Sequence, residues 1–147
     1  MDFPFQLQSG PMNCGPTCLK MIADYYQLDW DTEPITAETG LDGEGVTLFG
    51  MYTAASNMGF RVESVSLTLE ELLDGAYPPS ILYWGKTHYV VFTGKTEYGL
   101  DNRRIMEVAD PSAGMLRLDT AAFCSQWLNG TDEKDRPTGI ALLILPT

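Results

Sequence analysis

The sequence has few of the features that mark membrane, secreted or nucleic-acid-binding proteins. Its longest apolar runs, such as IALLIL at 140–145, are far shorter than the roughly 20 residues that a membrane-spanning helix needs. The start MDFPFQLQSG does not read as a signal peptide and the three cysteines are an odd number, so we expect free thiols in a reducing, cytoplasmic setting. Nine basic and 20 acidic residues give a net charge of −11 with no basic cluster, which argues against nucleic acid as a partner.

A chain of 147 residues is long enough to form one domain around its own hydrophobic core. The first half reads as helical: Thr47 is expected to cap a helix that ends near 57–59, and Thr68 with Glu71 forms a capping box before a short helix. The strand candidate FRVESVS lies between these two helices. The second half is β-rich, with one helix capped by Asp119 and the strand candidates SILYW, HYVVFTGK, RRIMEVAD, GMLRLD and GIALLIL. This order predicts an α+β fold in which N-terminal helices pack on an antiparallel sheet.

Two polar stretches interrupt this pattern. Residues 29–45 and 129–139 are rich in Gly, Asp, Thr and Glu, and both are expected to be surface connections without regular structure.

The first predicted helix, within NCGPTCLKMIADYY at 13–26, has a cysteine at its start. Asn13 suits the N-cap and Pro16 suits the first turn, so Cys14 lies at the positive end of the helix dipole. Unpaired amides and the dipole lower the pKa of a thiol there, which favours the thiolate. The rest of the helix carries one apolar stripe, at Cys18, Met21, Ile22, Tyr25 and Tyr26. With nothing else in view, a cysteine at a helix start is more often a small buried hydrophobic residue than a nucleophile.

His88 is the only histidine of the chain and begins a strand candidate. If this strand forms a hairpin centred near Gly99, paired residues have numbers that sum to about 198, and His88 faces Asp110. Directly opposed residues share a face with Cβ atoms roughly 5 Å apart, so the carboxylate is predicted to hold one imidazole nitrogen. A slip of one residue would put the two side chains on opposite faces.

Catalysis by a thiol needs a nucleophile, a base, a group that orients the base, and donors for the oxyanion. The chain offers one candidate for each role: Cys14 as the nucleophile, His88 as the base and Asp110 as the orienting group. Gln8, six residues before the cysteine, is the candidate oxyanion donor together with the Cys14 backbone N–H. No cofactor and no metal is expected for this chemistry.

Five segments spread over nearly the whole chain form a recognisable combination. They are Q-x5-CGPTCLKMIADYY from Gln8, GVTLFGMYTAASNMGF at 45–60, PPSILYWGKTHYVVF at 78–92, VADPSAG at 108–114 and AAFCSQWLNG at 121–130. Together they resemble the C39 peptidase domain, the papain-like cysteine protease domain of bacterial peptidase-containing ABC exporters.

The resemblance implies the same four roles for Cys14, His88, Asp110 and Gln8. It implies that residues 1–147 form the N-terminal domain of a longer exporter, cytoplasmic at the inner face of a bacterial plasma membrane, with transmembrane and ATPase domains beyond them. The expected partner is a bacteriocin-like or peptide-pheromone precursor with an amphipathic leader helix, which is cut after a double-glycine-type motif.

Two other readings stay open at this point. Some relatives have lost the cysteine and only bind the leader peptide, so a catalytically idle binding domain is one alternative. The other is a small zinc-binding module, because Cys14, Cys18, Cys124 and His88 formally make a Cys3His set. Cys18 lies on the apolar helix stripe and Cys124 lies within a helix, which favours packing over metal binding for both.

Overall fold

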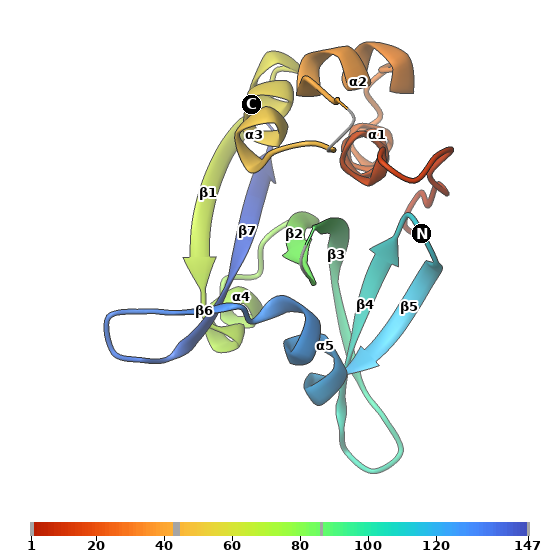
Figure 1. Ribbon diagram of the computed structural model, residues 1–147. Coiled ribbons are helices and arrows are strands. Elements are labelled where there is room, and N and C mark those ends of the chain that lie inside the picture. The colour runs from red at the N-terminus through yellow and green to blue at the C-terminus, as the bar shows by residue number, and fades with distance from the viewer. Residues whose placement is uncertain (1, 43–44, 86, 147) are drawn as a thin grey trace.

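The protein, described here as a computed structural model for residues 2–42, 45–85 and 87–146, is built around one twisted antiparallel sheet (Figure 1). The strand order is β1-β7-β2-β3-β4-β5, and β6 pairs with β7. The strands are β1 (Arg61–Leu67), β2 (Ser80–Trp84), β3 (His88–Tyr98), β4 (Arg104–Asp110), β5 (Gly114–Asp119), β6 (Gly130–Thr131) and β7 (Pro137–Leu145).

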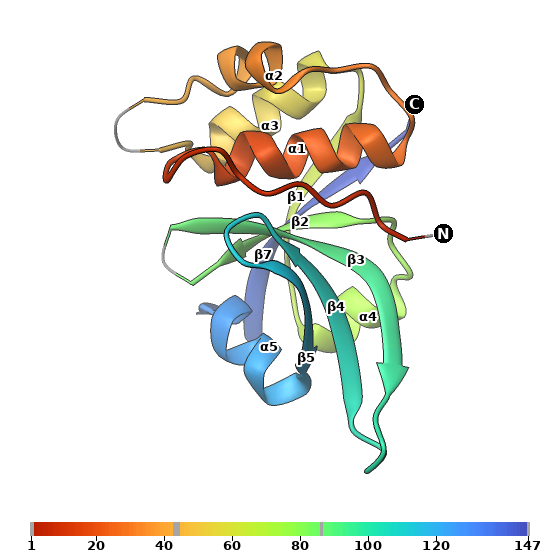
Figure 2. The ribbon, with the colours of Figure 1, turned by 90° about the vertical axis from the view of Figure 1, so that its right-hand side faces the viewer.

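Helices cover both faces of the sheet. On one side lie α1 (Cys14–Tyr25), α2 (Thr32–Thr39) and α3 (Leu48–Asn57), and α4 (Leu69–Asp74) and α5 (Thr120–Trp127) lie on the other (Figure 2). None of the helices in the described ranges is long and apolar enough to cross a membrane. The predicted α+β architecture, with N-terminal helices packed on an antiparallel sheet, is confirmed.

Alternate residues of the central strands supply two separate cores. The core beneath α1 to α3 contains Ile81, Tyr89, Val91, Leu142 and Ile144 from the strands. The core beneath α4 and α5 contains the residues between them, Leu82, Val90, Phe92, Ala141 and Leu143. Since successive side chains of a strand point to opposite faces, each central strand is apolar on both sides and is held between two layers.

The predicted helix caps are mostly confirmed. The Thr47 side chain accepts a hydrogen bond of 3.0 Å from the Gly50 N–H. Thr68 and Glu71 bond each other reciprocally, as a capping box does. Asp119 accepts from the first turn of α5. These caps depend on residues three positions apart, which is why the sequence alone identifies them.

The Asn13 cap is wrong in its detail. Asn13 occupies the N-cap position of α1, but its side chain makes no bond to the helix. Instead Oδ1 accepts from the Gly10 N–H at 3.0 Å and Nδ2 donates to the Ser9 hydroxyl at 2.8 Å. Asn13 therefore fixes the loop that precedes the helix, because that loop turns back towards it.

The apolar stripe of α1 is confirmed for Cys18, Met21 and Ile22, which are fully buried. It fails at Tyr25, which is 45% exposed at the last turn of the helix. This ring packs against Phe3 of the N-terminal segment and against Tyr26, with ring centroids 6.0 Å and 5.0 Å apart.

Both stretches expected to be irregular contain regular structure. Residues 29–45 hold α2, whose single large buried side chain is Ile35 and which ends at Gly40 with φ +69°. Residues 129–139 contain β6, which pairs with the start of β7. Helix α2 shows no apolar stripe because one side chain anchors it, and this is why the periodicity did not predict it.

The register of the β3–β4 hairpin differs from the expectation. Val91 pairs with Ala109 and Phe92 with Val108, two residues away from the predicted pairing. The register shifts again between Phe92 and Thr96, beside Gly94 with its φ of +89°. Because the displacement near the strand ends is an even number of residues, each side chain keeps the face that was predicted for it.

Candidate active site

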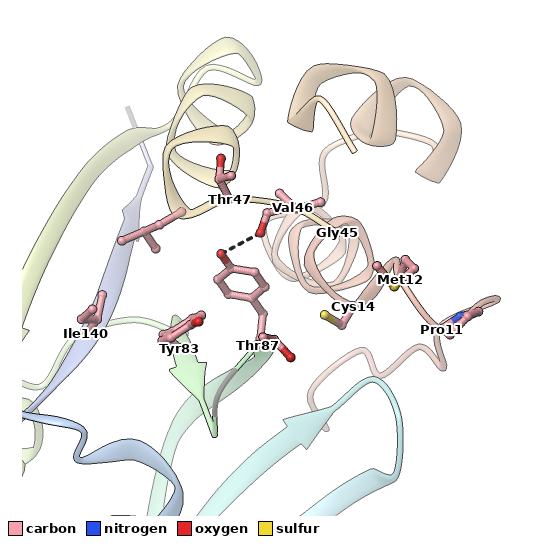
Figure 3. Close-up of a pocket in the computed structure, with 11 residues that line it drawn as sticks. Pro11, Met12, Cys14, Gly45, Val46, Thr47, Tyr83, Thr87 and Ile140 are labelled. Carbon is pink, nitrogen blue, oxygen red and sulfur yellow. Dashed lines mark hydrogen bonds between the residues drawn. The ribbon is translucent and has the colours of Figure 1, made fainter. Parts of the chain in front are cut away.

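Three elements meet at Cys14. The residue begins α1, is 8% exposed, and lines a pocket of about 420 Å³ between the helices and the sheet (Figure 3). His88 begins β3 and Asp110 ends β4, so both side chains lie at the same end of the hairpin. The sequence-predicted nucleophile, base and orienting group are thus brought together.

Hydrogen bonds connect these three side chains in a row. His88 Nε2 lies 2.7 Å from Asp110 Oδ1, and the His88 side chain is also hydrogen-bonded to that of Cys14. With Asp110 ionised, Nε2 carries a proton and donates it to the carboxylate, which leaves the other ring nitrogen, Nδ1, for the thiol. The contact between His88 and Asp110 is diagonal rather than directly cross-strand, because of the shifted register.

The surroundings favour charge on all three groups. Burial raises the pKa of Cys14, but hydrogen bonds from His88 and from the Tyr89 and Gly15 backbone N–H groups outweigh it, so the pKa is lowered. Burial lowers the pKa of His88, and its bonds to Asp110 and Cys14 more than compensate, raising that pKa to about 9. The arrangement therefore favours a thiolate beside an imidazolium near neutral pH.

Asp110 is held in its charged form. Burial raises the pKa of this carboxyl group, but the hydrogen bonds from His88 and Ser112 lower it by more. The bonds from Ser112 come from both its N–H, at 2.9 Å, and its hydroxyl, at 2.7 Å, and both reach Oδ1.

Ser112 is a site residue that the sequence reasoning missed. The available signal was the Asp-Pro-Ser order at 110–112, since an aspartate commonly accepts from the backbone two residues further on.

Gln8 lies next to the site, but its amide is engaged elsewhere. Its backbone N–H donates to the Pro111 carbonyl at 2.8 Å, which brings the N-terminal segment alongside Asp110. Its side-chain Nε2 donates to the Gly10 carbonyl at 2.7 Å, and Oε1 is buried without a hydrogen-bond partner. The role of Gln8 as an oxyanion donor stays a prediction.

The pocket beside Cys14 has aromatic and aliphatic walls. Figure 3 shows Tyr83, Val46 and Ile140 around it, with Met12 and Pro11 at the side of the cysteine. A second pocket of about 480 Å³ is lined by His88 and Asp110 together with residues of β5 and α5.

The other two cysteines differ from Cys14. Cys18 is fully buried, and burial raises its pKa well above the ordinary value. Burial also raises the pKa of Cys124 on α5. Among residues 2–42, 45–85 and 87–146, no three His, Cys, Asp or Glu side chains are arranged to hold a metal ion, so the Cys3His set is not assembled.

Solved structures share this fold. A double-glycine-motif protease from an AMS/PCAT transporter, in complex with the leader peptide, gives a TM-score of 0.82 at 23% identity, covering 99% of this chain and 93% of that chain. The peptidase domain of Streptococcus ComA, a bi-functional ABC transporter involved in a quorum-sensing pathway, gives 0.81 at 22% identity, covering 99% and 100%.

Sequence matches identify the family. The probable microcin-H47 secretion/processing ATP-binding protein MchF of Escherichia coli is 30% identical over 141 residues. The match covers 95% of this chain but spans only 18% of the length of that protein. The model of the Peptidase C39 family matches residues 2–131, and the chain belongs to this family.

Proposed function

We propose that this chain is a cysteine endopeptidase that removes the leader from bacteriocin-like or peptide-pheromone precursors after a double-glycine-type motif. The observation that carries the proposal is the row of hydrogen bonds from Cys14 through His88 to Asp110. Membership of the Peptidase C39 family and the secretion/processing names of its relatives support the substrate class.

The reaction begins with attack of the Cys14 thiolate on the carbonyl carbon of the scissile peptide bond. The carbonyl oxygen becomes an oxyanion, which accepts from the Cys14 backbone N–H in the first turn of α1 and from the Gln8 side-chain amide. For this, the Gln8 amide has to turn away from the Gly10 carbonyl that it bonds in the free protein.

Collapse of the intermediate breaks the carbon–nitrogen bond. The His88 imidazolium gives its proton to the leaving amine, and the acyl group stays on Cys14 as a thioester. His88 then takes a proton from water, whose oxygen attacks the thioester, and the thiolate leaves as the carboxylic product forms. Asp110 keeps the imidazole oriented throughout and stabilises its charged form.

The leader is expected to supply most of the affinity, because a Gly-Gly pair offers little surface to bind. An apolar helix face is compatible with the exposed side chains on α3, where Phe49 is 78% and Tyr52 is 40% exposed. Leu48 of the same helix lines the pocket that contains Cys14, so a leader docked on α3 would lead into the site.

In this proposal residues 1–147 are the N-terminal domain of a longer ABC exporter, with transmembrane and ATPase domains following them at the inner face of a bacterial plasma membrane. Support comes from relatives described as secretion/processing ATP-binding proteins, of whose length this chain spans 18%.

The test is digestion of candidate precursors that carry an amphipathic leader ending in Gly-Gly or Gly-Ala, with the cut site read by mass spectrometry. The wild-type protein should cut after the small pair, Cys14→Ala should not, and Cys124→Ala serves as the matched cysteine control. If the wild-type protein binds these leaders in calorimetry and leaves them intact, the chain is instead an idle leader-binding domain.

A further inference from the structure

Ser112 makes three close contacts with the row of polar side chains at the site. Its N–H donates to Asp110 Oδ1 at 2.9 Å and its hydroxyl donates to the same oxygen at 2.7 Å. The serine Oγ also lies 3.3 Å from His88 Nε2. Asp110 Oδ1 therefore accepts hydrogen bonds from both the His88 imidazole and Ser112.

The position of Asp110 in the fold explains why such a hold matters. Asp110 is the last residue of β4, and Pro111, which follows it, has no N–H to donate. The cross-strand partner of Asp110 on β5 is Gly114, which has no side chain to pack against the carboxylate. The Asp110 side chain is 10% exposed, and the hydrogen bonds to its Oδ1 come from His88 and Ser112.

We infer that Ser112 is a positioning residue, which fixes the Asp110 carboxylate against His88 and through it keeps the imidazole aligned with Cys14. The effect on turnover rests on the proposed function, whereas the effect on the imidazole does not require any substrate.

The Ser112 hydroxyl can act on the His88 pKa in two opposite ways, so the direction of the pKa change on its removal tells them apart. If Ser112 positions the carboxylate, its removal lets Asp110 rotate away, so the imidazolium loses part of its partner and the His88 pKa falls from about 9 towards its ordinary value. If the hydroxyl merely competes with His88 for Oδ1, its removal strengthens the bond to the imidazolium and the pKa rises.

His88 can be observed directly because it is the only histidine of the chain. Its imidazole signals in an NMR titration need no assignment, provided that the protein is purified without a polyhistidine tag. Within the described part of the chain, the titratable groups that act on its pKa are Asp110 from β4 and Cys14 from α1. The other described residues that line the pocket it shares with Asp110 are uncharged.

The experiment compares the His88 titration in the wild-type protein, Ser112→Ala and Ser112→Thr. We expect a lowered His88 pKa in Ser112→Ala and recovery in Ser112→Thr, which restores the hydroxyl. Ser125→Ala is the matched control, since this serine lines the same pocket but donates to the Ala122 carbonyl. An unchanged or raised pKa in Ser112→Ala, or an equal fall in Ser125→Ala, would overturn the inference.

Kinetics on a cleaved precursor provide the second measurement. Ser112→Ala should lower kcat about two- to tenfold, the worth of one hydrogen bond, and leave KM unchanged. In an Asp110→Ala background the same change should have no further effect, because Ser112 acts through Asp110. A further loss in that background would mean that Ser112 acts on His88 directly. If no precursor is cut while the NMR shift appears, the proposed function fails and this inference stands.

Discussion

The Tyr89 hydroxyl donates a hydrogen bond of 3.0 Å to the Val46 carbonyl and so joins the sheet to the segment that leads into α3 (Figure 3). The backbone N–H of the same tyrosine bonds the Cys14 thiol. Burial raises the pKa of Tyr89 far above neutrality, so the phenol keeps its proton and stays a donor. Tyr89 is thus hydrogen-bonded both to the pocket wall at Val46 and to the Cys14 thiol.

Tyr89→Phe should therefore destabilise the protein and weaken substrate binding. The Val46 carbonyl loses its donor, which costs about 1 kcal/mol of unfolding free energy, and the pocket wall becomes less fixed, so KM rises more than kcat falls. Urea denaturation and precursor kinetics measure the two effects. Tyr98→Phe is the control, since the Tyr98 hydroxyl is exposed near the hairpin tip; equal effects in both variants would contradict the assignment.

Replacement of the three cysteines should separate chemistry from packing. Cys14→Ala should lower kcat by more than about 10³-fold and leave the circular dichroism spectrum unchanged, because the thiol is the proposed nucleophile. Cys124→Ser should keep activity. Cys18→Ala should keep activity but cost about 1 kcal/mol of stability, since this side chain is fully buried. Cleavage by Cys14→Ala would rule out the proposed nucleophile.

The pH dependence follows from two pKa values that move in opposite directions. As pH rises through the lowered pKa of Cys14 the thiolate forms, and as pH rises through about 9 the His88 imidazolium loses its proton. Both are needed for turnover, so kcat/KM should be bell-shaped with its alkaline limb near pH 9.

Alkylation by iodoacetamide checks the acid limb without substrate. Cys14 should react quickly at neutral pH, whereas Cys124, whose pKa is raised, should react slowly. A Cys14 rate that increases only above the ordinary thiol pKa would contradict the ion pair.

Gln8→Ala should lower kcat by about 10²–10³-fold with little change in KM, as expected for the loss of one oxyanion donor. Apart from the Nε2 bond to the Gly10 carbonyl, Gln8 is held by its backbone N–H bond to the Pro111 carbonyl, which the variant keeps, so the variant should fold normally. Steady-state kinetics on a cleaved precursor give the answer. A change confined to KM would make Gln8 a substrate-binding residue.

Substrate choice would distinguish the proposed double-glycine peptidase from a general papain-like protease. Replacing either small residue before the scissile bond with Val should lower kcat/KM by orders of magnitude, because glycine allows a close backbone approach that a Cβ substituent prevents. A Gly-Gly peptide without its leader should be nearly inert. Efficient cleavage of unfolded casein would show that the assigned specificity is wrong.

Local sequence signals predicted what depends on nearby residues. The caps at Thr47, Thr68 and Asp119 use partners three residues away, and the strands are marked by their own apolar content. The predicted contact between His88 and Asp110 is present, although the hairpin register that predicts it is wrong by two residues. The contact forms all the same because a displacement by an even number of residues keeps both side chains on one face of the sheet.

What the sequence did not predict depends on tertiary contacts. Helix α2 is held by Ile35, a single side chain whose burial needs the rest of the helical layer. Tyr98 pairs with Arg104, so the hairpin turns about two residues beyond Gly99, and the register shift between Phe92 and Thr96 offsets only part of this displacement. The Gln8 amide bonds the Gly10 carbonyl only because the N-terminal segment folds back on itself, which no spacing of residues indicates.

The burial of the sheet between two layers has a consequence for how the reactivity of Cys14 changes on unfolding. Cys14 belongs to the helical layer and His88 to the sheet, so their mutual charging exists only while these layers are docked. If heat or denaturant separates the two layers, Cys14 loses the His88 contact and should react as slowly as an ordinary cysteine, even where the strands persist. The alkylation rate of the Cys14 sulfur therefore reports whether the helical layer is docked on the sheet.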